Sequence, residues 1–187
     1  MATVKQVKRR QRIEMAEGYL DLAMALDDFC TLDSKLRGSL VEQSLSSLQA
    51  IENPLGHKPY ILFLKGQAYR AIERYEDAIN YLEQSSSLEP DNIHTDLALA
   101  WCYKRTDQLP RAIEVMQHAV EFNSESAIAH YNLACYCSLY CQVDLALMHL
   151  TFALDLDSSY RDHVASESDF DAIRDNPRFA SLAGVGV

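Results

Sequence analysis

Residues 59–92 read PYILFLKGQAYRAIERYEDAINYLEQSSSLEPDN, and the pattern of this stretch returns in residues 93–126 and again in residues 127–160. Placing the three segments over one another aligns small residues with small residues and large apolar residues with large apolar residues. The clearest columns are Gly66, Ala100 and Ala134; Ala78, Ala112 and Ala146; and Leu82, Met116 and Leu150. A pattern that returns at a fixed spacing of this length indicates an array of stacked copies of one supersecondary unit.

Each unit is expected to form two antiparallel α-helices, so the predicted fold class is all-α. Small residues such as Gly66 stand where two helix backbones would approach closely, and large apolar residues such as Leu82 stand where side chains would interlock. The first unit resembles the tetratricopeptide repeat, whose pattern is W-x2-L-G-x2-Y, A-x3-F and P. The residues that carry this resemblance are Gly66, Tyr69, Ala78, Leu82 and Pro90, with departures at Leu62 and Lys65. The resemblance implies a right-handed superhelical solenoid of antiparallel helix pairs.

The residues before the array are expected to close its first end. Residues 1–12 are interpreted as a basic, flexible arm, and residues 13–58 as a degenerate repeat that caps the array. Apolar residues at helical spacing predict a first helix, on Ile13, Ala16, Leu20 and Ala23. A short second helix is expected to end at Gly38, and the capping-box pair Ser39 and Glu42 would start a further helix.

Residues 161–187 are expected to cap the last unit with a helix and a tail. Four apolar side chains would lie on the open end of that unit: Phe170, Ile173, Phe179 and Leu182. The stretch from Asp169 to Phe179 also resembles a tail that follows the last repeat of many bacterial tetratricopeptide proteins. A bacterial source is therefore expected.

The charges are distributed unevenly along the chain. Five of the 17 Lys and Arg residues lie in residues 1–12, all 27 Asp and Glu residues follow them, and the net charge is −10. This acidic body argues against nucleic acid as a partner. The sequence contains no apolar run of membrane-spanning length and no secretory signal, so a cytoplasmic protein without a membrane partner is expected. An odd number of cysteines fits free thiols in a reducing compartment: Cys30, Cys102, Cys135, Cys137 and Cys141.

The sequence predicts neither a catalytic site nor a metal or cofactor site, and the chain is interpreted as non-enzymatic. Cys137 and Cys141 lie one helical turn apart, with Cys141 expected at the tight turn between the two helices of its unit. Structural zinc needs four convergent ligands, and no second pair follows at zinc-finger spacing. His130 and His149 lie on the same repeat as these cysteines, but small buried thiols are usually packing residues. The histidines follow no HExxH pattern, and the sequence has no glycine-rich phosphate loop.

The resemblance implies that the first helix of each unit lines the concave face of the array. Residues on successive turns of these helices would stack into an apolar and aromatic groove with a basic edge. We expect the groove to bind a partner peptide or helix that carries an apolar anchor and a nearby acidic group. The expected site residues are Tyr60, Phe63, Gln67, Arg70, His94, Leu97, Trp101, Lys104, Arg105, Ile128, Tyr131 and Asn132.

Two alternatives to a partner in this groove stay open. Either the same side chains simply pack against neighbouring first helices, or the chain fills its own groove with residues 1–12 or the loop near Pro54. One class of partner is argued against, because tetratricopeptide domains that bind the C-terminal carboxylates of heat-shock chaperones use a clamp of Lys, Arg and Asn. The matching positions here hold Phe63, Gln67, Ala98, Ile128 and Asn132, so the cations of the clamp are missing.

The function expected from the sequence is that of an adaptor or assembly factor, which holds another protein in the concave groove. Two alternatives belong to other classes. One is a small chaperone for secretion substrates, and the other is a structural solenoid that associates with itself as a homo-oligomer.

Overall fold

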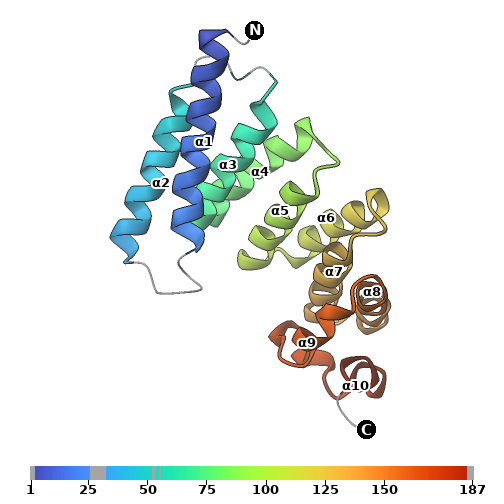
Figure 1. Cartoon of the computed structure of the whole chain (residues 1–187). Helices are drawn as coiled ribbons and strands as arrows, with labels where there is room; N and C mark the ends of the chain where they lie inside the picture. The colour runs from blue at the N-terminus through green and yellow to red at the C-terminus, as the bar shows by residue number, and fades with distance from the viewer. Residues whose placement is uncertain (1–2, 26–32, 52–53, 55, 185–187) are drawn as a thin grey trace. The chain divides into compact units, whose positions relative to one another are not determined.

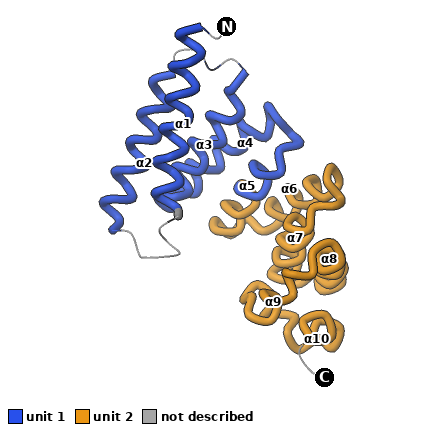
Figure 2. Tube along the Cα trace, viewed as in Figure 1, with its two compact units in different colours: residues 1–98 blue, residues 99–187 orange. Residues whose placement is uncertain are grey.

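The computed structural model of the chain defines residues 3–25, 33–51, 54 and 56–184. All regular structure in these residues is helical (Figure 1). The contacts divide the chain into two units, residues 1–98 and residues 99–187, with the division inside one helix (Figure 2). The predicted division at residues 12, 58 and 160 stays a prediction. The short helix expected before Gly38 lies mostly outside the described residues, as does Cys30.

Unit 1 consists of two packed helix pairs and the start of a fifth helix. Its helices are α1 (Val4–Ala25), α2 (Ser34–Gln49), α3 (Lys58–Ala71), α4 (Tyr75–Leu88) and the first turns of α5 (Ile93–Arg105). α1 packs against α2, α3 packs against α4, and α3 also contacts both helices of the first pair. The predicted helix with Ile13, Ala16, Leu20 and Ala23 on one face is confirmed, because all four side chains are buried in the core of this unit.

The described part of unit 2 contains the last turns of α5, three long helices and a compact C-terminal segment. Its elements are α6 (Leu109–Phe122), α7 (Ala127–Leu139), α8 (Val143–Leu156), η1 (Ser158–Tyr160), α9 (Arg161–Val164), η2 (Ser168–Ile173) and α10 (Pro177–Ala183). α7 packs against both α6 and α8, while η2 lies on α7 and α10 contacts α8 and α9. Phe170, Ile173 and Phe179 of the C-terminal segment are buried, and Leu182 is half-buried.

The two helices of a pair approach most closely where the sequence provides a small residue. A Cβ atom placed on Gly66 of α3 would lie 2.5 Å from Cγ and 2.7 Å from Cδ2 of Leu82 in α4. Nearby, the Ser85 hydroxyl donates a hydrogen bond of 2.8 Å to the backbone oxygen of Pro59. The Ser44 hydroxyl of α2 makes the same kind of bond to Ala16 of α1, at 3.0 Å. The α1–α2 pair is therefore joined in the same way as the α3–α4 pair.

The turn between the two helices of a unit has the same backbone conformation in all three repeats. Glu73, Asp107 and Cys141 follow one another at the repeat spacing, and each has a positive φ, between 58° and 60°. The residue after each one donates its N–H to a carbonyl five residues earlier, as in the bond of 2.8 Å from Gln142 to Cys137. This bond belongs to the Schellman motif, which usually places glycine at the left-handed position. The predicted tight turn at Cys141 is confirmed.

The N-terminal residues are helical where the sequence interpretation expects a flexible arm. α1 begins at Val4, so residues 4–12 form its first turns. The cause is a capping box: the Thr3 N–H donates to Gln6 Oε1 at 2.7 Å, and the Gln6 N–H donates to Thr3 Oγ1 at 3.3 Å. Lys and Arg, which dominate these turns, also favour helix formation.

The expected helix end at Gly38 is wrong. α2 runs without interruption from Ser34 to Gln49, with the Asp33 side chain accepting a hydrogen bond from the Lys35 N–H at its start. Glycine inside a helix costs about 1 kcal/mol relative to alanine. Burial of Val41 and Leu48 against α1 and α3 outweighs that cost.

Replacing Gly66 with alanine is expected to lower the free energy of unfolding by about 1–2 kcal/mol, because the new methyl group overpacks against Leu82. Gly18 in α1 provides the matched control, since a Cβ there meets no atom within 4 Å. Gly18→Ala should raise the free energy of unfolding by up to about 1 kcal/mol. Urea unfolding of both variants measures the difference, and equal effects would contradict the close approach.

Candidate partner-binding surface

The predicted site residues of unit 1 form an aromatic patch that α1 holds in place. The Tyr60 hydroxyl donates a hydrogen bond to a carboxylate oxygen of Glu17 on α1. The Tyr60 ring stacks on Phe63, with the ring centroids 6.0 Å apart, and Phe63 packs against the core of the unit. Partial burial, followed by the hydrogen bond to Glu17, raises the pKa of Tyr60 to about 12. The phenol is therefore neutral at physiological pH and presents a fixed, partly exposed ring.

The other predicted residues of unit 1 lie further along α3 and at the start of α5. Arg70 donates a hydrogen bond from Nη2 to Met24 Sδ, 3.7 Å away on α1. Gln67 and Leu97 are half-buried, and His94 is exposed. The cation expected to steer an acidic partner in this unit thus contacts α1.

In unit 2 the predicted cation Lys104 is bound by the chain's own C-terminal segment. Its Nζ atom lies 2.6 Å from Oδ1 of Asp169 in η2, and it also contacts Oδ2 of the same carboxylate. The two side chains are 28% and 11% exposed. A carboxylate as buried as that of Asp169 needs a compensating cation, so Lys104 contributes to the stability of this segment.

The predicted aromatic residue Tyr131 is covered by the same segment. Its ring meets Phe170 of η2 edge to face, with centroids 5.8 Å apart, and also contacts Tyr160 at 4.8 Å. Phe170 in turn packs on Phe179 of α10, with centroids 5.4 Å apart. Tyr131 is buried, and this burial raises the pKa of its hydroxyl. Tyr131 is thus part of an aromatic cluster that joins α7 to the C-terminal residues.

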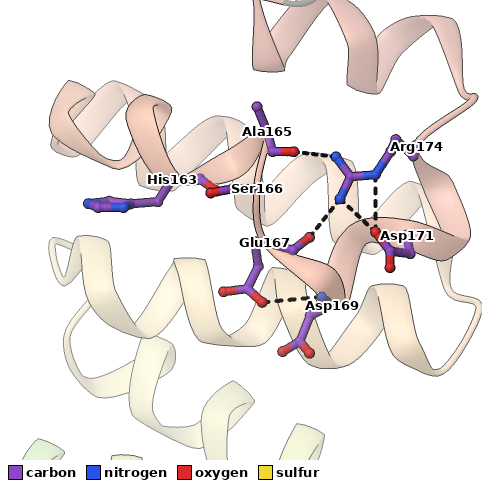
Figure 3. A network of polar contacts seen from close by, with 7 residues as sticks. All are labelled: His163, Ala165, Ser166, Glu167, Asp169, Asp171 and Arg174. Carbon is purple, nitrogen blue, oxygen red and sulfur yellow. Dashed lines mark hydrogen bonds and ion pairs between the residues drawn. The ribbon is translucent and has the colours of Figure 1, made fainter. Parts of the chain in front are cut away.

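A single arginine fixes the backbone that carries Asp169 and Phe170. The guanidinium of Arg174 donates hydrogen bonds to the backbone oxygens of Ala165 and Glu167, the second at 3.0 Å, and to the carboxylate of Asp171 at 2.6 Å (Figure 3). The Glu167 side chain accepts a hydrogen bond from the Asp169 N–H at 3.2 Å. These contacts hold residues 165–171 in one conformation and aim Asp169 at Lys104.

The remaining predicted residues of unit 2 lie at the edges of this arrangement. The Arg105 guanidinium lies over the ring of Trp101, 5.7 Å from its centroid. Ile128 is exposed on the first turn of α7, and the Asn132 side chain donates a hydrogen bond of 2.8 Å to the backbone oxygen of Ile128. Sequence reasoning identified Lys104 and Tyr131, and it left open that residues 1–12 or the loop near Pro54 fill the groove. Within unit 2, η2 contacts these two side chains, and the signal in the sequence was an acidic residue directly before Phe170.

Two of the cysteines of unit 2, Cys135 and Cys137, lie in surroundings that disfavour the thiolate. Cys102, Cys135 and Cys137 are buried, whereas Cys141 is exposed. Burial raises the pKa of the Cys135 thiol, and it raises that of Cys137 to about 11. The thiol is a poor nucleophile and metal ligand in this form. Among the described residues, no group of three His, Cys, Asp or Glu side chains is placed to hold a metal ion.

Two histidines form a hydrogen-bonded pair between α7 and α8. The Nδ1 atoms of His130 and His149 lie 3.0 Å apart, and His130 Nε2 lies 3.1 Å from the backbone oxygen of Ser124. Because a carbonyl oxygen only accepts, His130 carries its proton on Nε2 and accepts the His149 Nδ1 proton. Burial, followed by the nearby His130, lowers the pKa of His149 to about 4. The His149 ring is therefore neutral at physiological pH.

Replacing Lys104 with methionine is expected to lower the free energy of unfolding by about 2 kcal/mol, because the Asp169 carboxylate is left buried without a cation. Changing Asp169 to leucine in the same chain should restore most of this loss. The exposed pair Arg10 and Glu14 provides the control, and Arg10→Met should cost less than about 0.5 kcal/mol. A double-mutant cycle by urea unfolding measures the coupling, and additive effects at Lys104 and Asp169 would contradict it.

Lowering the pH should destabilise the fold through His149. Its pKa is 6.5 in the unfolded chain and about 4 in the folded protein, so the unfolded chain binds the proton more readily. The contribution to stability is intact above pH 6.5 and falls as the pH drops from 6.5 to 4. Between pH 7 and pH 5 we expect a loss on the order of 1 kcal/mol. His149→Gln should flatten the dependence, and the same change at the exposed His163 should not. Thermal unfolding across this pH range measures both slopes.

Comparison with known proteins places the repeats in a described family. Residues 70–134 match the family model of the tetratricopeptide repeat. The Phagocyte signaling-impaired protein of Drosophila pseudoobscura pseudoobscura is 33% identical over 95 residues, which are 48% of this chain and 10% of that protein. The chain thus spans about a tenth of the length of this curated relative. No helix in the described part of the chain has the length and apolar composition needed to cross a membrane.

Solved structures share the fold at low sequence identity. MamA from Desulfovibrio magneticus RS-1 superposes with a TM-score of 0.65 at 17% identity, over 92% of this chain and 95% of that one. YrrB, described as a TPR protein with an unusual peptide-binding site, superposes with a TM-score of 0.58 at 15% identity, over 97% and 90% of the two chains. The bacterial source expected from the tail stays a prediction. The matched residues thus identify tetratricopeptide repeats in residues 70–134, and the solved structures show that the chain shares their all-helical solenoid fold.

Proposed function

We propose that this chain is a non-enzymatic protein interaction module, an adaptor or assembly factor. Its first-helix residues would bind a peptide or helix that presents an acidic residue directly before an apolar anchor. Solenoids of helix pairs expose extended surfaces suited to such segments. YrrB, which has the same fold, is described as having a peptide-binding site, and this description agrees with the proposal.

One observation carries the proposal: the chain's own Asp169 and Phe170 meet the chemistry expected of the partner. Asp169 places its carboxylate against Lys104, and Phe170 places its ring edge against Tyr131. The two contacts lie on α5 and α7, the first helices of the second and third repeats. A partner segment with the same two features would compete with η2 for these contacts. We therefore propose that η2 acts as an internal ligand of this surface.

The experiment supplies the internal ligand as a separate peptide. A fluorescent peptide with the sequence of residues 166–175 is titrated into the wild-type chain and into the Asp169→Ala/Phe170→Ala variant. We expect micromolar binding to the variant and binding at least about tenfold weaker to the wild-type chain, because its own η2 occupies the contacts. Adding Lys104→Met to the variant should weaken binding by about tenfold again.

A matched control peptide replaces the residues that correspond to Asp169 and Phe170 with Asn and Ala. It should not bind any of the three chains. Because Phe170 is buried, circular dichroism checks that the double variant is folded, and Asp169→Ala alone serves as a milder variant that keeps the core intact. A folded variant that binds neither peptide, or binds both peptides equally, would contradict the proposal.

A further inference from the structure

α8 is apolar on the side that faces away from the rest of unit 2. Leu145, Met148, Phe152 and Leu156 follow one another along one side of the helix and are 37%, 41%, 48% and 43% exposed. The opposite side of α8 is buried in unit 2 through Ala146, Leu147, Leu150, Ala153 and Leu154. We call the first group the outer face of α8. A helix that is apolar on both sides is normally buried on both sides.

The chain itself shows that the fold does not need apolar residues at these positions. In the first repeat the positions of Leu145, Met148 and Phe152 hold Asp77, Asn80 and Gln84 on α4. In the second repeat they hold Arg111, Glu114 and His118, which are exposed on α6. The position of Leu156 is apolar in all three repeats, so it does not distinguish α8 from α4 and α6. Three large apolar side chains are therefore particular to α8, and such a patch marks an interaction surface.

The C-terminal elements leave the outer face of α8 uncovered. α10 contacts α8 beside Leu147 and Thr151, where Pro177 and Leu182 line a shallow surface pocket. The ring of Phe152 lies 5.3 Å from that of His130 and 6.4 Å from that of His149, along one edge of the face. The described residues of unit 2 thus border the face without burying it.

The charged side chains that α8 itself places beside the outer face are acidic. Arg178 of α10 pairs with Asp144 at 2.8 Å, but these two side chains are 65% and 91% exposed, so a cation of a bound helix can replace this weak contact. Asp144 and Asp155 lie on the same flank of the stripe, at opposite ends of α8 and about 16 Å apart along the helix axis. The helix contains neither Lys nor Arg from Val143 to Leu156, and the chain carries a net charge of −10. Pairing two copies of α8 would bring like charges together. A helix with cations beside its apolar residues would instead complement this flank.

We propose that the outer face of α8 binds an amphipathic helix of another protein. The apolar stripe of that helix covers Leu145, Met148 and Phe152, and Lys or Arg residues along one of its edges face Asp144 and Asp155. This site lies on a second helix of the repeat. It is independent of the first-helix surface that contacts Lys104 and Tyr131, so either proposal can fail without the other.

The test uses a labelled synthetic helix of about 18 Leu and Lys residues, long enough to form a stable helix on binding. Wild-type chain is compared with the variant Leu145→Asp/Met148→Asn/Phe152→Gln, which copies the residues of the first repeat. We expect binding to the variant to be at least about tenfold weaker. The variant gains a negative charge, so nonspecific attraction of a basic peptide would strengthen binding instead. Equal or tighter binding by the folded variant would overturn the proposal.

Three controls separate the contributions to binding. Phe122→Gln removes an exposed apolar side chain from α6 and should leave the affinity unchanged. Asp144→Asn/Asp155→Asn should weaken binding of the Leu/Lys helix by about three- to tenfold and reduce its dependence on salt. A peptide with Glu in place of Lys should bind at least about tenfold more weakly to the wild-type chain. If it binds as well as the Leu/Lys helix, the proposed partner chemistry is wrong.

Sedimentation equilibrium decides whether a second copy of the chain covers the face. We expect the wild-type chain and the triple variant to sediment as monomers of 21.2 kDa. A wild-type dimer that the triple variant converts to a monomer would show that two copies bind through α8, and it would overturn the proposed basic helix.

Discussion

The close approach of the two helices in a repeat is the constraint on which the rest of the structure depends. Gly66 lies so near Leu82 that even a methyl group at this position would clash. Backbones this close let large side chains on either side interlock, and they let the Ser85 hydroxyl reach the first turn of the partner helix. The left-handed turns at Glu73, Asp107 and Cys141 then return the chain at the required distance. Each repeat therefore has two outward surfaces, one on its first helix and one on its second.

The C-terminal segment shows how one such surface is used by the chain itself. Phe170 supplies the apolar contact to Tyr131, and Asp169 supplies the charge that meets Lys104. Arg174 holds the backbone just before these two residues through a hydrogen bond to the oxygen of Glu167. Burying a charged pair costs desolvation energy that only good geometry and further hydrogen bonds can offset. The arrangement therefore favours one placement of residues 165–171, and this placement depends on both members of the ion pair, Lys104 and Asp169. Under the proposed function, this surface would discriminate between segments that carry both the acid and the anchor and segments that carry only one of them.

The second outward surface differs among the repeats, and this difference is where the repeats specialise. α4 and α6 place polar or charged side chains toward water, whereas α8 places Leu145, Met148 and Phe152 there. A repeat architecture permits such divergence because the outward positions contribute little to the packing of the pair. The inward positions stay small or apolar in all three units, as Ala78, Ala112 and Ala146 illustrate.

The sequence by itself determined the repeat, the helix pairs and the tight turn at Cys141, because spacing and residue size are local properties that recur along the chain. It also identified Lys104 and Tyr131 as residues of interest. Only the tertiary structure decided which segment covers them, since Asp169 lies 65 residues from Lys104 and no periodicity links the two. Tertiary packing likewise keeps α2 helical at Gly38, because burial of Val41 and Leu48 outweighs the low helix propensity of one glycine. Local pattern thus set the repeating unit, and long-range burial and charge decided which of its surfaces the chain occupies itself.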